Sequence, residues 1–167
     1  VLFAILGFID DWVKFKHQKN KGISAITKFL AQCAIAITLI VGFNYFIQPI
    51  QWFEYGLYVF LLVGSSNATN LTDGLDGLLS SSMVISLIGV GVVSFLSLYH
   101  DILGLSVILV ITLLTFLLFN WKPAMLFMGD TGSLMLGGLL AAICLALDQW
   151  PLLVGFGGIF VIEALSV

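Results

Sequence analysis

Long apolar runs separated by short polar stretches make up the whole chain of 167 residues. A helix needs about 20 mainly apolar residues to cross a bilayer, and lipid requires every backbone polar group to be paired internally. The pattern therefore predicts the end of one helix at 1–9 and further helices at 29–47, 53–66, 78–98, 102–119, 131–148 and 151–167. The short 53–66 run favours a tilted or broken helix. We expect an all-α, polytopic transmembrane helical bundle with about six to seven spans or part-spans.

Composition supports a membrane protein over a soluble one. The chain is 60% hydrophobic and 9% charged, whereas soluble domains are about half apolar and about a quarter charged. The sequence starts at Val1 and ends at Val167 within apolar runs, so we expect one integral-membrane domain over 1–167, truncated at both ends. Cys33 and Cys144 lie in apolar runs without metal-ligand spacing, which favours helix packing over a disulfide or zinc site.

The charged residues divide between the two ends of the predicted helices. Alternation of the helices puts every lysine in or beside polar stretches on one side: Lys14, Lys16, Lys19, Lys21, Lys28 and Lys122. By the positive-inside rule this side is predicted to be cytoplasmic. Five acids share it: Asp10, Asp11, Asp73, Asp76 and Asp130. The opposite boundary carries Glu54, Asp101 and Asp148 singly.

The first polar stretch, FIDDWVKFKHQKNKG, begins with adjacent Asp10 and Asp11 and continues with lysines. Magnesium prefers hard oxygen ligands and commonly uses one or two carboxylates together with substrate phosphates. The pair is therefore a candidate phosphate and metal site. The alternative is that the two acids are interfacial charges and the lysines a topology signal that attracts anionic lipid. His17 is interpreted as a surface histidine.

The second stretch, NATNLTDGLDG at 67–77, places Asp73 and Asp76 three residues apart. On a helical turn their carboxylates would point the same way. Neighbouring amides and hydroxyls, including Asn70, suit a sugar, phosphate or base, and the acids suit metal binding or proton transfer. The alternative is helix capping with a glycine turn.

The third stretch, FNWKPAMLFMGDTGSL, joins Asn120 and Phe127 to Asp130, which is followed by Thr131 and Ser133. A helix N-terminus with small hydroxyl residues can hold an anion, and the adjacent carboxylate can hold the accompanying cation. Phe127 could stack on a flat base. The alternative is that Asp130 is only an N-cap.

Together, FIDDWVK, NLTDGLDGL, FNWKPAMLFMGDTGSL and VIEALSV resemble the superfamily of polyprenyl-phosphate N-acetylhexosamine-1-phosphate transferases, and most specifically its phospho-N-acetylmuramoyl-pentapeptide transferase branch. The resemblance covers essentially the whole chain. It implies a ten-helix enzyme of the bacterial cytoplasmic membrane, with its active site on the cytoplasmic face. The implied reaction transfers phospho-MurNAc-pentapeptide from UDP-MurNAc-pentapeptide to undecaprenyl phosphate with Mg²⁺, giving lipid I and UMP in peptidoglycan biosynthesis.

The resemblance also implies roles for individual residues. The implied catalytic acids are Asp10, Asp11, Asp73 and Asp76, and the principal Mg²⁺ ligand is Asp130. The implied substrate-binding residues are Lys14, Lys28, Asn70, Asn120 and Phe127. The partners expected are the two substrates and membrane lipid, with no nucleic acid; a homodimer is compatible with the sequence. Glu163 lies within the last apolar run and is a further functional candidate because ionisable residues in membrane segments commonly serve function.

Several alternatives are compatible with the sequence. The lipid phosphate could attack directly, with Asp10 as base, or an aspartate could first form a covalent intermediate; we favour direct attack. A sibling enzyme using UDP-GlcNAc would retain the same acidic stretches. A cation transporter could also use membrane acids, but it would more commonly place them within spans. Helices before Val1 and a His-rich loop after Val167, both implied by the resemblance, are absent, so we expect the segment alone to be inactive.

Overall fold

The computed structural model describes residues 1–17, 22–47 and 49–166. Every regular element in these ranges is a helix, as the apolar pattern predicted. The helices are α1 (Leu2–His17), α2 (Ala25–Phe46), α3 (Glu54–Thr72), α4 (Leu78–Leu96), α5 (His100–Asn120), α6 (Gly129–Ala146) and α7 (Pro151–Ser166). Lys19 and Lys21, which contributed to the sidedness prediction, lie outside the described residues.

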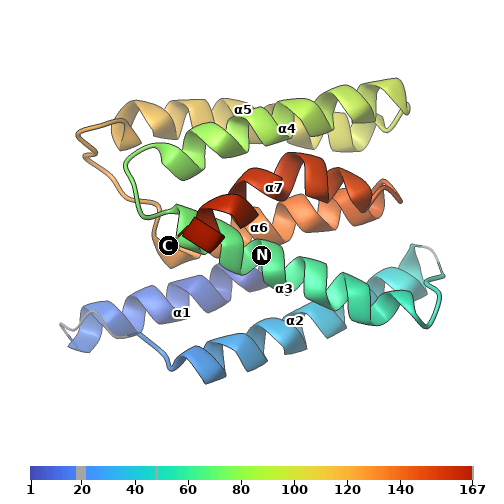
Figure 1. The fold of residues 1–167 in the computed structure, drawn as a ribbon, viewed down its shortest axis with the longest axis horizontal. Helices are drawn as coiled ribbons and strands as arrows, with labels where there is room; N and C mark the ends of the chain where they lie inside the picture. Colours follow the sequence, from blue (N-terminus) through green and yellow to red (C-terminus); the bar gives the residue numbers. More distant parts are fainter. Residues whose placement is uncertain (18–21, 48, 167) are drawn as a thin grey trace.

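The helices lie side by side, and their connections alternate between the two ends of the bundle (Figure 1). The end of α1, the α3–α4 and α5–α6 connections and the end of α7 share the left end in this view. The α2–α3, α4–α5 and α6–α7 connections share the right end. The polar stretches with the predicted catalytic acids therefore meet at one end of the molecule.

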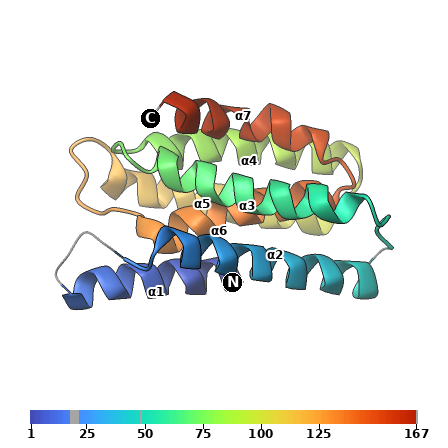
Figure 2. The same cartoon turned by 60° about the horizontal axis from the view of Figure 1, so that its bottom comes forward.

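Four helices among the described residues are long and apolar enough to cross a membrane: Ala25–Phe46, Leu78–Leu96, His100–Asn120 and Gly129–Ala146. Pro151–Ser166 is apolar but shorter. The protein is thus membrane-integral. In the turned view α6 lies between the pair α1 and α2 and the pair α4 and α5 (Figure 2).

Close packing of α6 against α1 and α3 depends on two glycines. A Cβ atom on Gly7 would overlap with the Asp130 carbonyl of α6, and one on Gly137 would overlap with Thr69 and the Ser65 carbonyl of α3. Small residues let membrane helices approach closely, and hydroxyl groups then hydrogen-bond across the contact. Three such bonds join α3 to α6: Ser65 Oγ to the Gly137 carbonyl at 2.8 Å, Ser66 Oγ to the Leu134 carbonyl at 3.2 Å and Thr69 Oγ1 to the Ser133 carbonyl at 2.8 Å.

Two predicted boundaries were wrong by more than five residues. Helix α1 continues past its apolar run to His17, and α3 runs unbroken to Thr72 rather than ending at 66. In α3 the polar side chains find partners within the helix: Asn67 Nδ2 donates to the Val63 carbonyl and Thr72 Oγ1 to the Ala68 carbonyl, both at 2.9 Å. Lys14 and Asn70 therefore project from regular helix rather than from a loop.

Candidate active site

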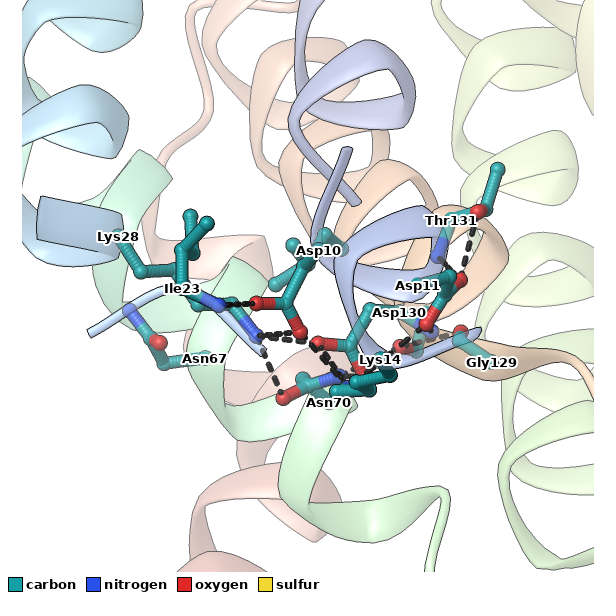
Figure 3. Close-up of polar contacts among 12 residues, drawn as sticks. Asp10, Asp11, Lys14, Ile23, Lys28, Asn67, Asn70, Gly129, Asp130 and Thr131 are labelled. Carbon is teal, nitrogen blue, oxygen red and sulfur yellow. Dashed lines mark hydrogen bonds and ion pairs between the residues drawn. The ribbon is translucent and has the colours of Figure 1, made fainter. Parts of the chain in front are cut away.

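Six of the predicted site residues meet where α1, α2, α3 and α6 approach one another (Figure 3). Helix α1 supplies three of them and the other helices supply one each. They are Asp10, Asp11 and Lys14 from α1, Lys28 from α2, Asn70 from α3 and Asp130 from α6. We refer to these six residues as the carboxylate–lysine cluster.

Asp10 is the most buried carboxylate of the cluster, with 3% of the residue exposed. Its Oδ1 accepts a hydrogen bond from the Ile23 N–H at 2.7 Å, and its Oδ2 lies 2.7 Å from Lys14 Nζ. A Cβ atom on Gly22 would overlap with this carboxylate, so glycine lets the backbone before α2 approach it. One oxygen of Asp10 is thus held by the backbone and the other faces the lysines.

Asp11 has a different environment because it binds the N-terminus of α6. Its Oδ1 accepts from the Asp130 N–H at 3.2 Å, and its Oδ2 accepts from the Thr131 N–H at 2.9 Å and the Thr131 hydroxyl at 2.7 Å. The first N–H groups of a helix lack partners within the helix, and a negative charge there is favourable. Asp11 of α1 therefore serves α6 as its cap.

Asp130 turns its side chain toward the lysines rather than capping its own helix. Its Oδ2 pairs with Lys28 Nζ and lies 3.0 Å from Lys14 Nζ. Its Oδ1 accepts from Asn70 Nδ2 at 3.1 Å, and the same Nδ2 lies 2.8 Å from Ser133 Oγ. The interpretation of Asp130 as only an N-cap does not describe this arrangement.

The three carboxylates of the cluster could hold a metal ion. Asp10, Asp11 and Asp130 each offer an oxygen, and these oxygens all lie within 4.8 Å of one another. Within the described ranges, two ammonium groups, those of Lys14 and Lys28, face them, so the three carboxylates and two lysines of the cluster sum to one negative charge. Hard oxygen donors with residual negative charge suit Mg²⁺, which also leaves coordination positions for water or phosphate.

Asp73 lies next to the cluster, just after α3. Burial raises the pKa of its carboxyl from 3.8 to about 6; a hydrogen bond from the Gly129 backbone opposes this rise, and the negative charges of Asp130 and Asp11 reinforce it. The carboxyl therefore faces the cluster closely enough to respond to its charges. Asp73 can exchange a proton near neutral pH more readily than an ordinary aspartate.

The carboxylates of Asp76 and Asp73 have different neighbours. Asp76 is exposed, and its Oδ2 accepts from the Ala124 N–H at 3.1 Å in the α5–α6 connection. The expectation that a helical turn would align the two carboxylates is wrong because α3 ends at Thr72. The chain then turns, and Gly77 adopts a φ of +73° that favours glycine.

Asn120 and Phe127 take no part in the contacts described above for the carboxylate–lysine cluster. Asn120 is 4% exposed, and its Oδ1 accepts from the Gly77 N–H at 3.2 Å and Ser80 Oγ at 2.9 Å. Its Nδ2 donates to the Leu126 carbonyl at 2.9 Å. Phe127 is 74% exposed. Asn120 thus joins the α3–α4 and α5–α6 connections, and Phe127 is free to contact a ligand.

Sequence reasoning missed Gln32, which is completely buried on α2. Its Oε1 accepts from Asn67 Nδ2 at 2.9 Å, and its Nε2 donates to Asn67 Oδ1 at 3.3 Å. The available signal was a polar residue within an apolar run, one helical turn after Lys28. His17 is exposed at the end of α1, as predicted for a surface histidine, and the candidate Glu163 is half-buried in the last turn of α7.

Comparison with known proteins identifies the family to which the sequence is similar. The sequence profile of glycosyl transferase family 4 matches residues 1–148. A phospho-N-acetylmuramoyl-pentapeptide-transferase from Listeria monocytogenes serotype 4b (strain CLIP80459) is 44% identical over 99% of this chain and 55% of the relative. Enzymes of the same name are 40% identical in Bacillus pumilus (strain SAFR-032) and 39% identical in Halalkalibacterium halodurans, over the same shares. The chain thus spans about half the length of these curated relatives.

Proposed function

The chain belongs to glycosyl transferase family 4, and on that premise we propose that its full-length protein is a Mg²⁺-dependent phospho-N-acetylmuramoyl-pentapeptide transferase. The substrates are UDP-MurNAc-pentapeptide and undecaprenyl phosphate, and the products are lipid I and UMP. The observation that carries this proposal is the meeting of three carboxylates and two lysines from three helices at one end of an apolar bundle. Relatives that match 99% of the chain are named phospho-N-acetylmuramoyl-pentapeptide-transferase, which supports UDP-MurNAc-pentapeptide over UDP-GlcNAc as the sugar substrate.

Joining two phosphates requires that their mutual repulsion be reduced and that they be aligned. Asp130, Asp10 and Asp11 would hold Mg²⁺, which when bound supplies positive charge to the phosphate oxygens. Lys14 and Lys28 already lie within 4 Å of Asp10 and Asp130 and would contact the same phosphates. Asn70 keeps Asp130 oriented through its bond to Oδ1.

The environments of Asp10 and Asp11 suggest different roles. Both oxygens of Asp11 accept bonds from α6, so this residue is better placed to orient the site than to attack. Asp10 Oδ2 faces Lys14 and Lys28 and would orient or deprotonate the lipid phosphate. An oxygen of that phosphate then attacks the β-phosphorus of the nucleotide sugar. The bond from this phosphorus to the bridging oxygen breaks, and UMP leaves with the electron pair.

The membrane location fits a lipid acceptor. The cluster lies at the end of the helices, where the phosphate of a membrane lipid would reside while its tail stays among apolar surfaces. Four lysines lie in or beside helices that begin or end on this side: Lys14, Lys16, Lys28 and Lys122. Lysines are enriched on the cytoplasmic side of membrane proteins, so we assign the site to the cytoplasmic face of the bacterial cytoplasmic membrane.

The test uses the full-length protein in detergent with undecaprenyl phosphate. UDP-MurNAc-pentapeptide or UDP-GlcNAc is added in turn, with and without Mg²⁺, and UMP release is followed. The proposal predicts release only with the muramoyl substrate and metal. Release with UDP-GlcNAc instead would place the protein with the sibling enzymes, and no release with either sugar would contradict a transferase function.

A further inference from the structure

A reciprocal amide pair connects α2 to α3 one helical turn from the carboxylate–lysine cluster. Gln32 and Asn67 each donate to and accept from the other, at 2.9 and 3.3 Å, and Asn67 also donates to the Val63 carbonyl at 2.9 Å. Gln32 follows Lys28 by four positions, and Asn67 precedes Asn70 by three, so each amide shares a helix face with a member of the cluster.

Helix α2 has a narrow contact with the bundle. Its buried residues are Gln32, Ala36 and Ile40, which form a single stripe at intervals of four. Ala36 and Ile40 are apolar, and in a membrane such residues discriminate poorly between packing positions because lipid is equally apolar. Gln32 does discriminate, because sliding α2 by one turn, about 5.4 Å, would break both hydrogen bonds of the pair. The buried Gln32 amide would lose its partners, and Asn67 would keep only its bond to the Val63 carbonyl.

We propose that the Gln32–Asn67 pair is a positioning element that fixes α2 against α3 and so holds Lys28 at the phosphate site. Single buried polar residues are known to specify helix register in this way. Lys28 Nζ must reach Asp130 on α6 and Asn70 on α3, and neither contact would survive a one-turn displacement of α2. The claim that Lys28 acts on phosphate rests on the proposed function; the claim about its position does not.

The first test measures the position of Lys28 without using activity. Full-length protein is treated with a limiting amine-acylating reagent, and modification of Lys28 is compared with that of exposed Lys16 by peptide mass spectrometry. In the Gln32→Leu, Asn67→Leu double variant, Lys28 should react about tenfold faster relative to Lys16, as expected for loss of a charge-assisted hydrogen bond. An unchanged ratio in a folded double variant would overturn the proposal.

The second test separates positioning from stability. Each single leucine variant removes both bonds of the pair and leaves the remaining amide with unmet hydrogen-bonding groups, so its Tm should be lower, whereas the double leucine variant should recover much of that loss. Its kcat should nevertheless stay about ten- to a hundredfold low, because small misplacements of binding groups are costly. The reversed pair, Gln32→Asn with Asn67→Gln, should restore kcat. A double leucine variant with normal kcat would show a purely structural role.

Two controls complete the design. Thr38→Val also removes a polar group from α2, but Thr38 is exposed and donates only to the Ala34 carbonyl of its own helix, so kcat and labelling should not change. In a Lys28→Ala background, Gln32→Leu should cause no further loss of kcat; an equal further loss would contradict action through Lys28. If wild-type protein releases no UMP, the proposed function fails while the labelling ratio still decides the positioning claim.

Discussion

The carboxylate of Asp11 on α1 binds both the backbone N–H and the hydroxyl of Thr131 on α6, at 2.9 and 2.7 Å. One member of the predicted catalytic pair therefore joins two helices that are more than 100 residues apart in sequence. The neighbouring Asp10 instead faces Lys14. Adjacent aspartates on one helix thus have different contacts: Asp11 accepts bonds from the helix that carries Asp130, and Asp10 faces the lysines.

Removing the Thr131 hydroxyl tests this connection. Thr131→Val keeps the shape of the side chain but loses the donor to Asp11, so the free energy of unfolding should fall by about 1 kcal/mol. Thr131→Ser retains a hydroxyl and should stay close to wild type. Thermal unfolding in detergent measures both variants. Equal Tm values for the valine variant and wild type would contradict a stabilising role for the contact.

The close approach of α3 and α6 makes Gly137 intolerant of a side chain. Gly137→Ala would overlap with the Ser65 carbonyl, which is backbone and cannot rotate away, so we expect a loss of about 1–3 kcal/mol in stability. Gly104→Ala on α5 is the matched control, since a Cβ atom there has no neighbour within 4 Å. Comparing the two Tm values tests the packing directly. A neutral Gly137→Ala would contradict the described contact.

The raised pKa of Asp73 predicts how stability depends on pH in metal-free protein. Burial favours the neutral carboxyl, with a pKa of about 6 against an ordinary 3.8. Folded protein therefore holds this proton more tightly, so its contribution to stability is full below about pH 4 and is lost as pH rises through about 6. The slope of Tm with pH in this interval should be less negative for Asp73→Asn than for wild type. Parallel curves would contradict the shift.

The sequence predicted the helices well because membrane helices have a length requirement that hydropathy reports directly. It failed at the polar ends, where α1 reaches His17 and α3 reaches Thr72. Hydropathy cannot register Asn67 or Thr72 as helical, since both are polar and their side chains are satisfied by carbonyls of their own helix. Apolarity alone therefore does not report these boundaries.

The site was only partly predictable for a related reason. Motifs identified Asp10, Asp11, Lys14, Lys28, Asn70 and Asp130, which the structure brings together. They did not separate these residues from Asp76 and Asn120, which bond to the α5–α6 connection. Nor did they reveal that Gln32 faces Asn67. Such pairings depend on helix rotation and spacing between elements, which one sequence does not report.

The most direct measurement is a Mg²⁺ titration of UMP release by the full-length protein and two charge-matched variants. Asp130→Asn removes a carboxylate from the proposed metal site, and Asp101→Asn removes one from the first turn of α5 at the opposite end of the bundle. We predict that Asp130→Asn lowers Mg²⁺-dependent release by at least about a hundredfold, whereas Asp101→Asn follows the wild-type curve. Near-normal release by Asp130→Asn over the same Mg²⁺ range would contradict the central claim that these carboxylates and lysines form one metal and phosphate site.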